Sequence, residues 1–151
     1  MRGRDPGGDV AETVVVDSSA LVDLLIDPGA GGRAVADRLR GCALVAPDLL
    51  FAETANVLRK LRHRGVLSDA EASMAFAELM ELPIESWPFE TLAERVWMLR
   101  SSVTSYDATF LALAELLAAP LVTRDARMVR AANGLARAPE GRGAPVEVVD
   151  R

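Results

Sequence analysis

A run of almost uninterrupted apolar residues from Ala108 to Ala118 places the strongest constraint on how this chain can fold. Glu115 is the one charged residue in the run, and a helix that is apolar on all sides must be buried among other elements. Pro120 ends the run, and the short apolar segment 121–123 is typical of a strand buried on both faces. A buried helix that leads into a buried strand predicts an α/β domain with a parallel sheet.

The rest of the chain repeats this alternation of short apolar strands with helices. Strands are expected at 13–16, 43–46, 82–85, 121–123 and 146–149, with Pro83 placing 82–85 at an edge. Helices are expected at 20–26, 33–40, 48–63, 69–81, 89–100, 106–118 and 126–133, with Ser105 capping 106–118 and Ser68 and Glu71 forming a capping box. The pattern predicts an α/β fold with a central, mainly parallel sheet flanked by helices. Residues 13–151 are expected to form one domain, preceded by a disordered extension at 1–12.

Several acidic residues lie next to the predicted strand and helix ends. Asp17 and Asp125 follow strands, and Asp107 lies in the first turn of the buried helix. Glu53 lies at the edge of the apolar face of helix 48–63. Because strand ends and helix starts of a parallel sheet share one rim, these carboxylates are expected to meet there. Taken singly, each also has a structural explanation as a cap, a partner of the helix dipole or a solvated edge.

The donor types of this acidic group indicate which cation it would suit. Carboxylates that converge repel one another, and their pKa values rise, unless a cation lies between them. The chain has one histidine, His63, and one cysteine, Cys42, which argues against a zinc site of nitrogen or sulfur ligands. Oxygen ligands suit Mg²⁺, or alternatively Mn²⁺, and such an ion can polarise a phosphodiester and activate water.

Charge and cysteine content narrow the possible partners and compartment. A net charge of -5 argues against a generally basic nucleic-acid surface, although a local metal site leaves a nucleic-acid substrate open. Cys42 has no second cysteine to pair with, as expected in a reducing cytoplasm. No apolar run approaches the roughly 18 residues of a membrane span, and the first dozen residues lack the apolar core of a secretory signal. The sequence therefore predicts a cytoplasmic protein with no membrane partner.

Four short motifs resemble those of PIN-domain proteins, in the same order and at similar spacing. Asp17, Glu53, Asp107 and Asp125 each lie in one of them, within the segments 15–21, 47–58, 106–114 and 121–125. Together the motifs resemble the VapC toxins of bacterial VapBC toxin–antitoxin pairs, over about residues 13–133. The extension before Thr13 departs from that pattern, in which the first strand starts almost at once.

The resemblance implies a PIN fold and an Mg²⁺-dependent endoribonuclease that acts as the toxin of a type II toxin–antitoxin system. It implies that Asp17, Asp107 and Asp125 hold the metal, and that the metal and Glu53 orient a water for attack on RNA. The products would carry 5′-phosphate and 3′-hydroxyl ends. It also suggests that Ser18 and Thr123 bind the substrate, by positioning phosphate or metal-bound water.

The resemblance further implies a cognate VapB-type antitoxin and a homodimer. The C-terminal segment of the antitoxin would lie across the acidic rim and present an Arg or Lys, because a guanidinium can replace the charge of the metal. The homodimer would form through the helices at 33–40 and 69–81.

Two other functions are compatible with parts of this pattern. A PIN-fold binding module could lack catalysis and only sequester a protein or RNA partner. A phosphoryl-accepting receiver domain also gathers acids at strand ends, but this chain has no lysine on its last strands.

Other side chains remain open to a structural or a functional reading. The basic cluster 59–64 either stabilises a helix C-terminus or contacts RNA or antitoxin, and Arg124, Arg127 and Arg130 are open to similar readings. Trp87, Phe89 and Trp97 are expected in the core or an interface.

Overall fold

The computed structural model describes residues 11–137 and 145–149, and its centre is a parallel β-sheet. The strands are β1 (Thr13–Val16), β2 (Ala43–Pro47), β3 (Ile84–Trp87), β4 (Leu121–Thr123) and β5 (Val146–Val148). Their spatial order is β3-β2-β1-β4-β5, and all four neighbouring pairs are parallel. The predicted central parallel sheet is therefore confirmed, and β3, which follows Pro83, lies at an edge.

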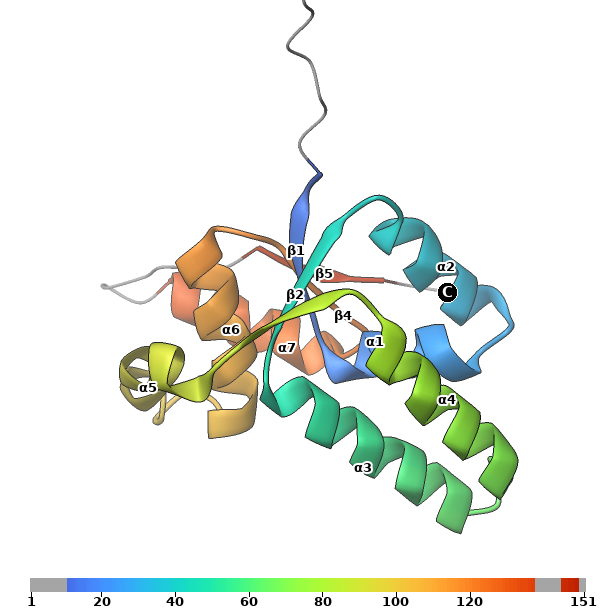
Figure 1. Ribbon diagram of the computed structural model, residues 1–151. Coiled ribbons are helices and arrows are strands. Elements are labelled where there is room, and N and C mark those ends of the chain that lie inside the picture. Colours follow the sequence, from blue (N-terminus) through green and yellow to red (C-terminus); the bar gives the residue numbers. More distant parts are fainter. Residues whose placement is uncertain (1–10, 138–144, 150–151) are drawn as a thin grey trace, which may run out of the picture.

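The helices connect successive strands. They are α1 (Ser18–Ile26), α2 (Ala30–Leu39), α3 (Leu49–His63), α4 (Asp69–Glu81), α5 (Phe89–Met98), α6 (Ser105–Leu117) and α7 (Ala126–Ala136). From β1 to β3 the chain moves toward one edge of the sheet, and from β3 to β5 it moves back past β1 to the other edge. Because parallel crossovers are right-handed, helices α1–α4 cover one face and α5–α7 the opposite face. Figure 1 shows this separation, with α5 and α6 on the left and α2 and α4 on the right.

The order of the strands creates one topological switch point, between β1 and β4. The connection that leaves β1 runs toward β2, whereas the chain that leaves β4 runs toward β5 on the other side. Ligands of open α/β sheets bind in the crevice that forms at such a point, beyond the carboxyl ends of the strands. Asp17 follows β1 directly, and Asp125 lies two residues after the end of β4. The fold therefore places Asp17 on one side of this crevice and Asp125 on the other.

The centre of the core is β1 together with α6. Val14, Val15 and Val16 are completely buried, and every residue of α6 from Ala108 to Ala114 is buried as well. Each large aliphatic or aromatic side chain buried in this way contributes roughly 1.5–3 kcal/mol to the free energy of unfolding. The all-round apolar character of this helix is explained by its position, since it packs against β1, β2, β4 and α5.

Several helix and strand ends differ from the prediction. Helix α2 begins three residues earlier, at Ala30, because the Asp27 carboxylate accepts hydrogen bonds from the N–H groups of Gly29 and Gly32. The cap of α6 is Thr104 rather than Ser105, and the cap of α1 is Asp17 itself. Strand β3 is shifted by two residues toward the C-terminus, α5 ends at Met98, and α7 continues to Ala136.

The two ends of the domain are fastened to the sheet. The backbone oxygen of Glu12 accepts a hydrogen bond from Ala43, and its carboxylate pairs with Arg38, which also pairs with Glu147 of β5. Residues 1–10 lie outside the described residues, so the expected disorder of the extension stays a prediction. Among the described residues, Glu12 is thus held against β2 and α2.

Helix α6 ends in an unusual way, because its C-cap is a left-handed alanine. Ala118 has φ 48° and ψ 38°, a conformation that costs an L-residue roughly 1–2 kcal/mol but costs glycine nothing. We expect Ala118→Gly to raise the free energy of unfolding by up to about 1 kcal/mol in urea titrations. The matched control is Ala77→Gly on the exposed face of α4, which should lower it by about 0.5–1 kcal/mol. Equal destabilisation by both variants would contradict the assigned backbone strain.

Candidate active site

A cleft of about 430 Å³ lies at the switch point of the sheet. It is bordered by the starts of α1, α6 and α7 and by the first half of α3. The cleft is lined by all four acidic residues predicted from the sequence, which are Asp17, Glu53, Asp107 and Asp125. Ser18 and Arg127 also line it. The four residues are separated by up to 108 positions in the chain, and they come together because α1, α6 and α7 all start at this rim.

Asp17 is the most constrained acid of the cleft. It is only 6% exposed, and one of its carboxylate oxygens accepts a hydrogen bond from the Ser18 N–H at 2.8 Å. The other oxygen accepts hydrogen bonds from the Ser19 hydroxyl at 2.6 Å and the Thr123 hydroxyl at 2.7 Å. Because these donors come from α1 and β4, they fix the carboxylate in one orientation at the junction between the two faces of the fold.

Ser19 and Thr123 form a second layer beneath this carboxylate. Ser19 accepts a hydrogen bond from the Arg124 N–H, and Thr123 accepts one from the Asp125 N–H. Thr123 is completely buried, so its described contacts hold Asp17 and the turn after β4 and do not face the open cleft. Ser18, in contrast, lines the cleft, and its side chain hydrogen-bonds Glu53. Ser19 was not among the predicted site residues, although its hydroxyl two positions after Asp17 was the available signal.

The pKa of Glu53 reflects its burial and the nearby acidic residues. Burial raises the pKa of Glu53 above its ordinary value of 4.5, and the negative charges of Asp17 and Asp107 raise it further. The hydrogen bond from Ser18 acts in the opposite direction but does not cancel the effect. The expectation that at least one carboxyl of the group has a raised pKa is therefore confirmed, and it means that Glu53, Asp17 and Asp107 lie within electrostatic range of one another.

Asp125 has a cationic partner within the chain. Its carboxylate caps α7 by accepting a hydrogen bond from the Arg127 N–H, and it also forms an ion pair with the Arg127 guanidinium at 2.7 Å. That guanidinium is the main reason why the pKa of Asp125 is lowered. The side chain of Arg127 is 82% exposed, so the pair itself is weak and can open at little cost.

The other arginine of this segment has a structural role. Arg124 is mostly buried, forms an ion pair with Asp23 of α1 at 2.7 Å, and donates a hydrogen bond to the backbone oxygen of Val149. It thereby joins α1, the turn after β4 and the C-terminal strand. The Arg124 side chain therefore stabilises the fold, whereas the Arg127 side chain is exposed at the edge of the cleft.

The donor set fits a hard cation, although the site is not closed. Among the described residues, no three His, Cys, Asp or Glu side chains already stand close enough together to hold a metal ion. Within the cleft, the Asp125 carboxylate is paired with the Arg127 guanidinium. The cleft nonetheless gathers carboxylate and hydroxyl oxygens. Burial and then the charges of Asp17 and Asp107 raise the pKa of Glu53, and a divalent cation would relieve the repulsion between these charges.

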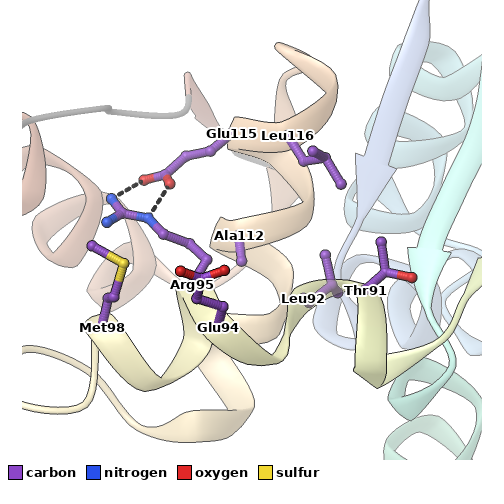
Figure 2. Close-up of a pocket in the computed structure, with 8 residues that line it drawn as sticks. All are labelled: Thr91, Leu92, Glu94, Arg95, Met98, Ala112, Glu115 and Leu116. Atoms are coloured by element: carbon purple, nitrogen blue, oxygen red, sulfur yellow. Dashed lines mark hydrogen bonds and ion pairs between the residues drawn. The ribbon is translucent and has the colours of Figure 1, made fainter.

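A larger hollow, of about 680 Å³, lies elsewhere, between α5 and α6. Figure 2 shows that the Glu115 carboxylate and the Arg95 guanidinium point toward each other across it and form a bidentate ion pair, with distances of 2.6 and 3.1 Å. This ion pair explains how the otherwise apolar helix accommodates the charge of Glu115. The pair neutralises the charge of both groups, so the hollow lacks the crowded acids that mark the cleft.

The remaining predicted functional groups are placed as follows. In the basic cluster, Arg62 pairs with Asp69 and Arg59 with Asn56, both at the exposed end of α3. Trp87 packs against the core, whereas Phe89 and Trp97 are exposed. No helix in the described part of the chain is both long enough and apolar enough to cross a membrane.

Comparison with known proteins identifies relatives over most of the chain. A family model described as "PIN domain" matches residues 14–134. Ribonuclease VapC12 of Mycobacterium tuberculosis is 35% identical over 136 residues, which is 90% of this chain and 98% of the relative.

Solved structures support the same fold. The crystal structure of PAE2754 from Pyrobaculum aerophilum has a TM-score of 0.62 and 25% identity, covering 91% of this chain and 84% of that chain. A toxin–antitoxin complex from Klebsiella pneumoniae has a TM-score of 0.58 and 19% identity, covering 91% of this chain and 98% of that chain. These similarities agree with the parallel-sheet fold.

Proposed function

The chain belongs to the PIN-domain family, and on this basis we propose that it is a metal-dependent endoribonuclease that acts as the toxin of a type II toxin–antitoxin pair. The observation that carries the proposal is the cleft, in which Asp17, Glu53 and Asp107 repel one another at the switch point of the sheet. Carboxylates arranged in this way repel one another and lower the stability of the fold. Such groups are typical of functional sites, and here they support metal-assisted chemistry. The name of the 35% identical ribonuclease supports RNA as the substrate.

In this function Asp17, Asp107 and Asp125 would hold Mg²⁺ or Mn²⁺, which when bound would supply polarisation of the phosphodiester and a lower pKa for an attacking water. Asp17 is presented by its three hydrogen bonds, so that little reorganisation is needed when a cation enters. Asp125 joins by releasing the exposed side chain of Arg127.

Glu53 is the general base of the proposed reaction. Its raised pKa brings the carboxylate closer to the range in which it can accept a proton from water near neutral pH. Ser18, which hydrogen-bonds Glu53 and lines the cleft, orients that carboxylate and contacts the substrate phosphate. Thr123 contributes through Asp17, because its hydroxyl is buried against that carboxylate.

The proposed partners are RNA, a VapB-type antitoxin and a second copy of the chain. The toxin–antitoxin complex of the same fold supports the antitoxin, and the exposed apolar side chains Met74, Phe76 and Met80 on α4 support an interface there. An Arg or Lys of the antitoxin would pair with the acids of the cleft, as Arg127 pairs with Asp125. Action in the cytoplasm stays a prediction.

The direct test is cleavage of RNA by the purified chain. We expect cleavage of total cellular RNA with Mg²⁺ or Mn²⁺ and none with EDTA, and a map of new 5′ ends would identify the target. Binding of RNA or of a protein partner without any cleavage, in the presence of each metal, would instead support the catalytically silent binding module.

A further inference from the structure

The acidic cleft continues into a second hollow, on the side of α7. This hollow, of about 480 Å³, lies between α7 and the loop that joins α5 to α6. Asp107 and Arg127 line both the cleft and the hollow, so the two spaces share a border. Arg100, Ser101 and Ser102 of the loop supply much of the remaining wall. We refer to this region as the α5–α7 hollow.

The α5–α7 hollow is less acidic than the cleft, because Arg100 and Arg127 line it and Asp107 is the one described carboxylate in its wall. Arg100 pairs with no carboxylate among the described residues, and its guanidinium donates a hydrogen bond only to the backbone oxygen of Trp97, at 2.7 Å. Arg127 reaches the same hollow with a side chain that is 82% exposed. Two accessible guanidinium groups and several hydroxyls thus adjoin a group of repelling carboxylates.

Trp97 adds an aromatic surface beside Arg100. It is 67% exposed, although aromatic residues make up only 5% of the chain, and the Arg100 guanidinium lies 4.8 Å from the centre of its ring. Since Arg100 covers one side of the ring, this exposure means that much of the other side faces solvent. The sequence analysis expected Trp97 in the core or an interface, and within the described chain it is not in the core.

We propose that the α5–α7 hollow, with Trp97 at its edge, binds a single-stranded segment of RNA next to the bond that is cut. Arg100 and Arg127 pair with phosphate oxygens, and an unpaired base stacks on Trp97 or on the guanidinium plane of Arg100. The inference rests on the proposed ribonuclease function and adds to it the surface that binds the substrate strand.

The physical need for such a surface follows from charge. The chain has a net charge of -5, and the cleft that must receive a phosphodiester is itself acidic, so RNA is repelled unless neighbouring cations offset the repulsion. Arginine serves this purpose better than lysine, because its planar group can both pair with phosphate and stack on rings. Asp107 and Arg127 line both the hollow and the cleft, so RNA bound in the hollow would lie next to the catalytic acids.

The kinetic test uses variants that leave the catalytic acids intact. Arg100→Ala and Trp97→Ala remove the phosphate and stacking contacts, whereas Arg100→Lys and Trp97→Phe keep part of each. The control is Arg40→Ala, which also removes an exposed arginine; Arg40 is paired with Asp37 at the end of α2, on the opposite rim of the sheet. Cleavage of a single-stranded oligoribonucleotide gives kcat and KM, and melting curves establish that each variant is folded.

We expect Trp97→Ala to raise KM roughly 5-fold or more, as base–aromatic contacts do on truncation, with kcat nearly unchanged. Arg100→Ala should also raise KM, and it should reduce the salt dependence of RNA binding by about 0.7 in logarithmic slope, as expected for one lost phosphate contact. The binding measurement uses Asp17→Asn protein, so that the RNA is not cut. Trp97→Phe should retain most of the affinity, and Arg40→Ala should match the wild type.

Other outcomes would overturn the inference in distinguishable ways. Efficient cleavage with an unchanged KM in both alanine variants would reject the α5–α7 hollow as a substrate site and leave the ribonuclease intact. Conversion of a dimer to a monomer by Trp97→Ala, with RNA binding unchanged, would identify a contact between copies instead. Absence of both RNA binding and cleavage in the wild type would reject the proposed function and this inference together.

Discussion

Asp17→Asn and Asp107→Asn are each expected to reduce metal-dependent RNA cleavage by roughly 10²- to 10³-fold or more, because a bound metal contributes several kcal/mol to the transition state. Both residues line the cleft, and both act electrostatically on Glu53. The same substitutions should relieve the growth inhibition caused by expression of the chain. Rates on a defined oligoribonucleotide, measured with Mg²⁺, Mn²⁺ and EDTA, provide the measurement.

The fold should survive both substitutions. Asparagine is as good an N-cap as aspartate, and the Ser19 and Thr123 hydroxyls that now donate to Asp17 can rotate to accept from an amide. Asp107 lies in the first turn of α6, where loss of its charge costs at most about 1 kcal/mol. Loss of activity without unfolding is therefore the expected signature.

Asp48→Asn is the matched control for these two variants. Asp48 lies at the start of α3 on the same rim, but it is exposed, makes no side-chain cap hydrogen bond and does not line the cleft. Its substitution should leave cleavage unchanged. If Asp17→Asn and Asp107→Asn protein both cleave RNA as fast as the wild type, the assignment of the active site is wrong.

The parts of the fold that sequence could predict are those that depend on local patterns. Apolar runs located the strands and the buried helix, and the position of acids after strands indicated one rim. The network around Asp17 could not be found in this way, because Thr123 reaches it from 106 positions away through the pairing of β1 with β4. The early start of α2 was missed because it depends on the side chain of Asp27, not on the propensity of its glycines.

The pKa values of the individual acids, and the ion pair that one of them forms, could not be predicted from the sequence either. Proximity of four carboxylates predicted a raised pKa, but which group carries it depends on burial, and Glu53 is the acid for which burial is the leading cause. Asp125 behaves in the opposite way because Arg127, two residues further on, turns back to pair with it. Sequence spacing alone gives no sign of these two different environments.

The raised pKa of Glu53 predicts how stability depends on pH and on metal. Between the ordinary pKa of 4.5 and the raised pKa of Glu53 in the folded chain, the folded chain binds more protons than the unfolded chain. The free energy of unfolding therefore falls as pH rises through this interval, and the full penalty is present above it. Glu53→Gln removes the penalty, so we expect it to melt at a higher temperature than wild type in EDTA at pH 7, and to lose this advantage below pH 4.

Mg²⁺ should have the complementary effect. A hundredfold excess over Kd would raise the free energy of unfolding of the wild type by about 2.7 kcal/mol, and the rise should be smaller in Glu53→Gln because less negative charge attracts the ion. Glu78→Gln, an exposed position on α4, should behave like the wild type in both conditions. If Mg²⁺ does not shift the wild-type melting curve and Glu53→Gln is markedly less stable in EDTA, then Glu53 supports the fold, and the cleft is not a site of metal-assisted chemistry.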